Sequence, residues 1–184
     1  MRRLSARRAA AALASDTEEF ERLGYRAGEG DSPHSVALKA PGEGRDLVLR
    51  LRPEGRVFGG NWGLEVSTVE PVLPATARGL AARGRGVVKM QGVRFRARRG
   101  DDESASRVAD ALSADTALGE ALGRVHFERV TVEPDGRPAI RHLGGSVVWL
   151  LLPPVVRATP LPEGQSEAIV AALEEFARAG ERIM

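Results

Sequence analysis

The chain has three histidines, His34, His126 and His142, which are the side chains best suited to acid–base chemistry near neutral pH. No two of them stand in an H-x-H, H-x-x-x-H or H-E-x-x-H pattern, so the local sequence predicts no metal site. His126 and His142 fall in successive predicted strands, and a three-residue loop between these strands would place His142 opposite Glu128. Such a pair could transfer protons. A shift of one residue in register removes it, and a structural or surface pair is the simpler interpretation.

Patterns for nucleotide-binding and hydrolytic sites are incomplete. Gly28 and Gly30 begin a dinucleotide fingerprint, but Pro33 stands where the third glycine should be. The sequence contains neither a phosphate loop of the G-x-x-x-x-G-K-[ST] kind nor a G-x-S-x-G motif. Ser146 follows two glycines but opens a strongly apolar segment, so we interpret it as the start of a strand.

The sequence offers no clear metal ligands among its acids and no thiolate. Asp101, Asp102 and Glu103 are explained as the start of a helix, where acids cap the chain and suit the helix dipole. The absence of cysteine excludes disulfides and a thiolate nucleophile. We expect no metal and no cofactor, and favour a protein that is not an enzyme. The alternative is an enzyme of unrecognised type that uses His142 with Glu128, or His34 in its glycine-rich loop.

Charge is segregated along the chain, although the formal net charge is only +2. Residues 1–8 carry four arginines and no acid, and residues 71–100 carry eight cations and no acid. The small net charge argues against general binding of nucleic acid, whereas the segregation favours a local cationic surface.

Alternation in the predicted strand from Val93 arranges part of this charge in a row. Side chains of Arg94, Arg96 and Arg98 point to the opposite side from Phe95 and stand about 7 Å apart. Arg99 continues the series. Guanidinium groups suit phosphate or carboxylate partners because they present a fixed fork of donors. The alternatives are pairing with the chain's own acids and charged protection of a sheet edge.

The expected partner is an acidic protein or a small anionic ligand. Proteins that bind single-stranded nucleic acid interleave aromatic side chains with cations. This chain has only 2 Trp, 1 Tyr and 5 Phe, so a nucleic-acid-associated factor is the weaker alternative. Trp62, in the glycine-rich segment 59–63, is a candidate for a pocket or an interface, whereas Trp149 is expected in the core. No membrane partner is expected, and a homodimer is left open.

The elements that must position these residues follow from hydrophobic periodicity and turn signals. Helices are predicted at 4–23, with Gly24 as a stop, at 75–83, at 101–123 with a continuation or restart at Asp115, and at 165–179. Strands are predicted at 36–38, 47–52, 57–69 with a bulge or close backbone approach near Gly59, 87–90, 93–99, 125–133, 139–143 and 146–152.

This order predicts an α+β fold: mostly antiparallel sheet, helices packed on one face, and a single compact domain over residues 1–184. Residues 12–17 (Ala-Leu-Ala-Ser-Asp-Thr) recur as residues 111–116 (Ala-Leu-Ser-Ala-Asp-Thr), 99 positions later. An internal duplication of a helix-plus-three-strand unit, with pseudo-repeats 4–83 and 93–180, is therefore one hypothesis, and alanine-rich composition is the other.

Composition and the ends of the chain fit a small intracellular protein. The 184 residues are 42% hydrophobic and 28% charged, which is typical of a globular domain. The longest apolar run, residues 147–152, ends at two prolines and is too short for a membrane-spanning helix. Residues 9–14 are too short and too alanine-rich for the core of a signal peptide. We expect a cytoplasmic location.

One resemblance is carried by the segment Gly144–Pro154, with Arg157, Pro160 and Leu161, preceded by residues 93–96 (Val-Arg-Phe-Arg). It resembles an uncharacterised bacterial family of small cytosolic proteins that has no assigned activity. The resemblance therefore implies no catalytic or binding residue. The bias towards Ala, Arg and Gly is typical of a bacterial genome of high GC content.

Overall fold

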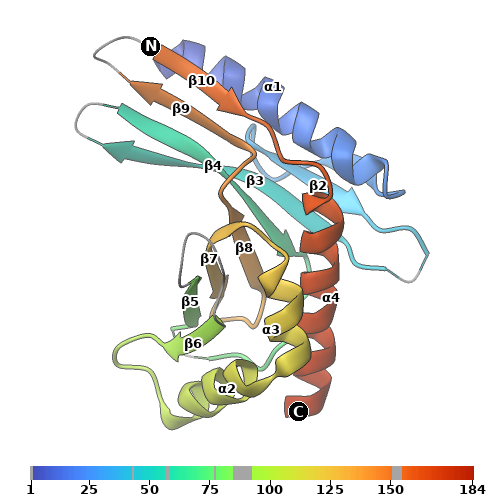
Figure 1. Cartoon of the computed structure of the whole chain (residues 1–184), viewed down its shortest axis with the longest axis vertical. Helices are drawn as coiled ribbons and strands as arrows, with labels where there is room; N and C mark the ends of the chain where they lie inside the picture. The colour runs from blue at the N-terminus through green and yellow to red at the C-terminus, as the bar shows by residue number, and fades with distance from the viewer. Residues whose placement is uncertain (1, 43, 57–58, 77, 85–92, 151–154) are drawn as a thin grey trace.

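The computed structural model describes residues 2–42, 44–56, 59–76, 78–84, 93–150 and 155–184. In this part of the chain, four helices accompany one ten-stranded sheet in which every pairing is antiparallel, an α+β fold as predicted (Figure 1). The elements in chain order are α1 (Arg2–Glu21), β1 (Arg26–Glu29), β2 (Ser35–Lys39), β3 (Leu47–Arg56), β4 (Gly59–Thr68), β5 (Leu80–Gly84), β6 (Val93–Ala97), α2 (Glu103–Ala114), α3 (Thr116–Gly123), β7 (Phe127–Val132), β8 (Pro138–His142), β9 (Ser146–Leu150), β10 (Val155–Thr159) and α4 (Gln165–Ile183).

The long strand β4 joins the parts of the sheet. The strand order is β1-β2-β3-β4-β8-β7-β5-β6, and β9 pairs with β4 and with β10. Residues 59–62 of β4 pair with β9, and residues 65–67 pair with β8. One strand therefore connects the β9–β10 hairpin to the strands that carry the arginines.

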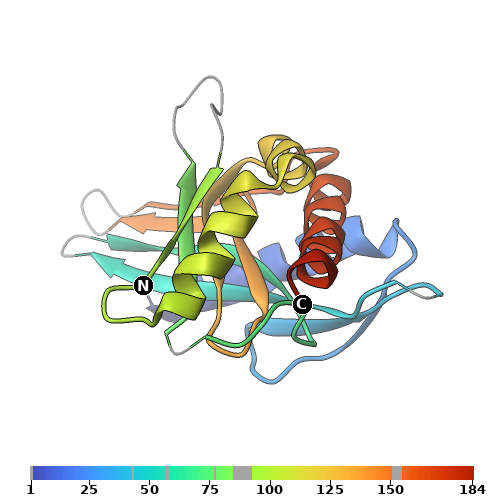
Figure 2. The ribbon, with the colours of Figure 1, turned by 90° about the horizontal axis from the view of Figure 1, so that it is seen from below.

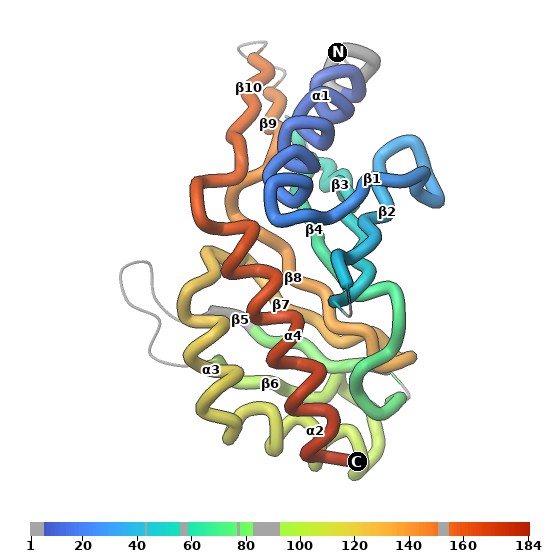
Figure 3. The backbone as a smooth tube through the Cα atoms, turned by 90° about the vertical axis from the view of Figure 1, so that its right-hand side faces the viewer, coloured from blue at the N-terminus to red at the C-terminus, as the bar shows by residue number. Residues whose placement is uncertain are grey.

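The helices cover one face of the sheet. Helix α1 packs on β2, β3, β9 and β10, helix α4 on β4 and β8, and helix α2 on β6 (Figure 3). Helices α2, α3 and α4 gather at the lower end of Figure 1, as the view from below also shows (Figure 2). None of the helices in the described ranges is long and apolar enough to cross a membrane.

Alternation along the strands separates a core face from an open one. Leu64 and Val66 of β4 are fully buried under the helices. The residues between them, Gly63 and Glu65, point to the opposite side of the sheet. Within the described ranges no helix packs on that side, which we call the helix-free face.

Several predicted features are confirmed. Gly24 follows α1 with a φ of +93°, and Gly136 adopts +88° in the turn between β7 and β8. Residues Glu103–Gly123 form two helices with the restart at Asp115. Helix α4 extends past the predicted end at residue 179 to Ile183.

The predicted helix at 75–83 is wrong. Residues Leu80–Gly84 form strand β5 between β6 and β7. Leu80 and Ala82 alternate towards the core and are 0% and 2% exposed. Pairing on both edges and this burial outweigh the helix propensity of the alanines. The predicted strand at 87–90 lies outside the described residues.

Three more features depart from the prediction. Strands β1 and β10 were not predicted, because short exposed strands carry little hydrophobic pattern. Gly59 and Gly60 form no bulge, since β4 pairs with β3 in continuous register. They instead allow a close approach, because a Cβ on Gly60 would lie 2.9 Å from the Trp149 ring. The irregularity lies in β7, between Phe127 and Arg129.

Candidate functional site

The predicted arginine row lies on the helix-free face, at the lower end of the sheet. Strand β6 buries Phe95 (2% exposed) and exposes Arg94 and Arg96 on the opposite side. Arg98 and Arg99, just beyond the last residue of β6, are also exposed. We call Arg94, Arg96 and Arg98 the arginine row.

At the middle of β6, helix α2 covers part of the sheet edge. There the backbone N–H of Phe95 points away from β5 and donates to Ser113 Oγ of α2, at 2.9 Å. A side chain of α2 therefore satisfies this edge group.

Small side chains separate the row from other arginines on the same face. Arg96 lies opposite Ala81 of β5, and Ala81 lies opposite Thr131 of β7. Arg129 stands two residues before Thr131 and shares its face. Short side chains therefore lie between the guanidinium groups of β6 and that of β7 on this face.

These arginines have no ion-pair partner among the described residues. Arg94, Arg96, Arg98 and Arg129 have no carboxylate within 4.0 Å there. The only acid in the segments that the structure does not describe is Glu43. Internal pairing, one of the alternatives to a partner, therefore does not occur for the row in the described part of the chain.

Arginines of β3 on the helix-free face are neutralised. Arg52 Nε lies 2.7 Å from Glu65 Oε1, and Arg50 pairs with Asp31. The sheet thus has one part in which arginines are matched with acids, and another, at β6 and β7, in which they are not.

Arg141 of β8 forms the centre of the matched part. Its side chain is 4% exposed, with Nη1 2.7 Å from Glu54 and Nε 3.0 Å from Glu128. The guanidinium lies flat on Gly63, where a Cβ would be 2.7 Å from Nη2. Glu128 therefore pairs with Arg141, and it is not bonded to His142.

His142 is a buried histidine. It is 2% exposed and lies opposite Phe127, because the irregularity in β7 displaces Glu128 from the predicted register. Its Nδ1 accepts from the Gly144 N–H at 2.7 Å, so its proton is on Nε2, which donates to Gln165 Oε1 at 2.9 Å. Burial lowers the pKa of His142, against the effect of these hydrogen bonds, and favours the neutral ring.

The structure brings two other candidates together, His34 and Trp62. Their ring centroids are 4.5 Å apart, with an angle of 57° between the planes. Trp62 is half-buried against the core, and His34 Nδ1 is buried without a hydrogen-bond partner among the described atoms. Trp149, expected in the core, is also half-buried. His126 is exposed, with its ring centroid 6.3 Å from that of His142.

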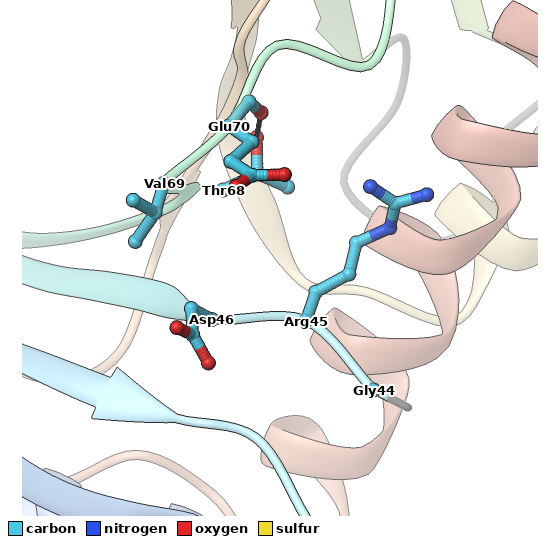
Figure 4. A pocket seen from close by; sticks show the side chains of 6 residues that line it. All are labelled: Gly44, Arg45, Asp46, Thr68, Val69 and Glu70. Atoms are coloured by element: carbon cyan, nitrogen blue, oxygen red, sulfur yellow. Dashed lines mark hydrogen bonds between the residues drawn. The ribbon is translucent and has the colours of Figure 1, made fainter. Parts of the chain in front are cut away.

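Two pockets lie away from the arginine row. One, of about 330 Å³, is lined by residues 44–46 and 68–70. Figure 4 shows its charged side chains, Arg45, Asp46 and Glu70, pointing in different directions, so they do not converge on one ligand position. Across the described part of the chain, no three His, Asp or Glu side chains are grouped as metal ligands would be.

The second pocket is an apolar groove of about 350 Å³ between α1 and β10, and Asp16 lies at its base. Asp16 is 1% exposed; its Oδ1 accepts from the Leu161 N–H at 3.1 Å, and its Oδ2 has no partner in the described structure. Burial raises the pKa of Asp16 to about 7, the Leu161 N–H opposes this shift, and Glu19 adds to it.

Sequence reasoning missed Asp16, Arg129 and Arg141. A signal existed for Asp16, because it lies three residues after Leu13 and four before Phe20, on the apolar side of the predicted helix. The other two could not be found without the strand order, since their environment comes from β3, β4 and β5.

Comparison with known proteins identifies a family. Residues 19–179 match the model of a family described as protein of unknown function, DUF3156. The chain belongs to the DUF3156 family. No curated protein and no solved structure matches the chain. The DUF3156 match covers both halves of the molecule, including β6 and its arginines, whereas the resemblance seen in the sequence rested mainly on residues 144–161.

Proposed function

We propose that the protein is a non-enzymatic binding protein whose arginine row, with Arg99 and Arg129, holds an anionic partner. One observation carries this proposal: the exposed arginines at the end of the helix-free face are unpaired in the described structure, whereas Arg50, Arg52 and Arg141 on the same face are paired.

The physical argument is electrostatic. Like charges held side by side on a rigid strand repel one another and raise the local positive potential. Matched acids relieve this repulsion at β3 and β8, and no described acid does so at β6. A carboxylate or phosphate brought by a partner would supply the missing charge and accept bidentate hydrogen bonds.

The partner is an acidic protein segment or a small anionic ligand. The Ser113 side chain occupies the backbone N–H of Phe95 at the edge of β6, so an incoming segment would be recognised by side chains on the face and not by adding a strand at this position. We also propose that this takes place in the bacterial cytoplasm, the setting that the composition favours.

The test is binding of poly-L-glutamate, followed by fluorescence anisotropy. The variant Arg94→Glu/Arg96→Glu/Arg98→Glu should lose at least about tenfold in affinity, because three attractive contacts become repulsive. A matched control reverses three exposed arginines away from the row: Arg26→Glu/Arg107→Glu/Arg124→Glu. It has the same net charge and should stay within about threefold of the original protein.

If both triple variants lose the same affinity for poly-L-glutamate, binding depends on net charge and not on the arginine row. A nucleic-acid role predicts instead that duplex or single-stranded DNA binds more tightly than poly-L-glutamate, with affinity falling steeply as salt rises.

A further inference from the structure

A second exposed surface lies at the opposite end of the sheet, on the β9–β10 hairpin. Val148, Leu150 and Val155 are 40%, 42% and 43% exposed. Leu150 lies directly opposite Val155, and Val148 lies opposite Arg157, so all four side chains share one face. We call the three aliphatic residues the hairpin end.

The hairpin end is contiguous and belongs to an apolar stretch of sequence. Isolated exposed aliphatic residues are normal, but a cluster on one strand pair indicates a surface that something covers. The four residues that join β9 to β10 are Leu, Leu, Pro and Pro, so residues 147–156 include no polar or charged side chain apart from the indole N–H of Trp149. Trp149, between Val148 and Leu150 in β9, points to the opposite face of the hairpin, where it is half-buried over Gly60.

Positive charge lies at the same end of the molecule as the hairpin end. Residues 143–162 contain no acid, and neither do residues 1–15, which include four arginines. Arg8 Nη1 donates to the Val156 carbonyl oxygen, which ties the start of α1 to β10. The first turns of α1 and the outer ends of β9 and β10 lie together at the top of Figures 1 and 3. Arg7, Arg8 and Arg157 are exposed there.

We infer that the hairpin end binds the surface of an anionic lipid bilayer. The aliphatic side chains enter the boundary between headgroups and acyl chains, and the flanking arginines contact lipid phosphates. The association is peripheral and reversible.

Charge decides between a bilayer and a second copy of the chain. Two copies joined through their hairpin ends would bring two acid-free, arginine-rich ends together, and repulsion would oppose the apolar contact. An anionic bilayer would bury the aliphatic side chains and also provide negative charge for the arginines. This surface is separate from the arginine row, so the inference does not depend on the proposed function.

The experiment is co-sedimentation with vesicles of equal parts phosphatidylglycerol and phosphatidylcholine, beside vesicles of phosphatidylcholine alone. The protein should bind the anionic vesicles, and Leu150→Asp/Val155→Asp should weaken binding by about tenfold or more. Leu143→Asp/Val69→Asp is the matched control, because it adds the same two charges away from the hairpin end: Leu143, in the turn between β8 and β9, is 61% exposed, and Val69, just after β4, is 40% exposed. It should leave binding within about twofold.

Further variants separate apolar insertion from charge and from misfolding. Leu150→Thr/Val155→Thr places β-branched residues, which suit strands, at both positions and should also weaken binding, with an unchanged far-UV circular dichroism spectrum. Arg94→Glu/Arg96→Glu/Arg98→Glu should keep most of the vesicle binding.

Three results would overturn the inference: no sedimentation of the original protein with anionic vesicles, binding by the Thr and Asp double variants as tight as that of the original protein, or loss of binding only in the arginine-row variant. Light scattering after size exclusion tests the second-copy alternative. A dimer that Leu150→Asp/Val155→Asp converts to a monomer would assign the hairpin end to self-association instead.

Discussion

Two buried titratable side chains, Asp16 and His142, flank the turn between β8 and β9. Gly144 donates its N–H to His142, and a Cβ on Gly145, which has a φ of +62°, would lie 2.9 Å from Asp16 Oδ2. Burial moves the two pKa values in opposite directions, upwards for Asp16 and downwards for His142. Both shifts favour the neutral form of the side chain, so the surroundings of this turn disfavour a charge on either residue.

Replacing Asp16 with Asn should remove one pH-dependent component of stability. The folded-state pKa of about 7 exceeds the usual 3.8, so the folded state binds more protons between these values and the free energy of unfolding falls as pH rises from about 4 to 7. Asp16→Asn keeps an oxygen that accepts from the Leu161 N–H, but its free energy of unfolding should not fall over this pH range. The variant should therefore be more stable than the original protein near pH 8, by up to about 4 kcal/mol.

Urea unfolding near pH 5 and pH 8 measures this effect. His142 provides an internal reference, because its lowered pKa produces a loss of stability as pH falls below about 6.5 in both proteins. The same change in stability between the two pH values for both proteins would mean that Asp16 carries no such shift.

Residue types alone predicted the exposed arginines of β6 but not the surroundings of the histidines. Alternation fixes which side of a strand a residue faces, and Phe95 and Arg94 obey it. The pair His142–Glu128 depended on register, which one irregularity in β7 changed. Burial of Asp16 comes from β9, β10 and the segment at Leu161, which are far away in sequence.

At the scale of elements, local signals predicted the helices better than the short strands. Caps and periodicity lie within the segment itself, and they gave α2, α3 and α4 with errors of a few residues at the ends. Strands β1, β5 and β10 form through pairing with distant residues, so no local pattern distinguished them from loop or helix.

The break between α2 and α3 depends on Asp115, which ends one helix and caps the next. Its Oδ1 accepts from the Leu118 N–H at 3.0 Å, and its Oδ2 pairs with Arg182. Asp115→Ala should lower the free energy of unfolding by about 1–2 kcal/mol. Asp115→Asn keeps the cap, loses only an ion pair whose arginine side chain is 50% exposed, and should cost less than about 1 kcal/mol.

Thermal unfolding of both variants compares these contributions, with Asp102→Ala as a reference for a helix cap without this ion pair. Asp102 caps α2 through the Ala105 N–H at 2.9 Å. If Asp115→Asn is as unstable as Asp115→Ala, the ion pair with Arg182, and not the helix cap, stabilises the junction between α2 and α3.

At the scale of the whole molecule, the sheet is continuous and its charge is divided. Arginines are paired with acids around Arg141, unpaired with any described acid at β6, and placed around aliphatic residues at the hairpin end. The internal duplication stays a prediction. Its matching aspartates have different roles, because Asp16 is buried within α1 whereas Asp115 caps α3.

Continuity through β4 predicts that the chain unfolds in one step. Strand β4 pairs with β3, β8 and β9, helix α4 packs on β4 and β8, and Leu161, just before α4, bonds Asp16 of α1. Tryptophan fluorescence reports on Trp62 and Trp149, both in the β4–β9 part of the sheet, whereas far-UV circular dichroism reports mainly on the helices. Urea transitions followed by the two signals should coincide, as expected of a single cooperative domain. If fluorescence changes at a lower urea concentration, the β9–β10 end unfolds separately, and residues 1–184 are not one cooperative unit.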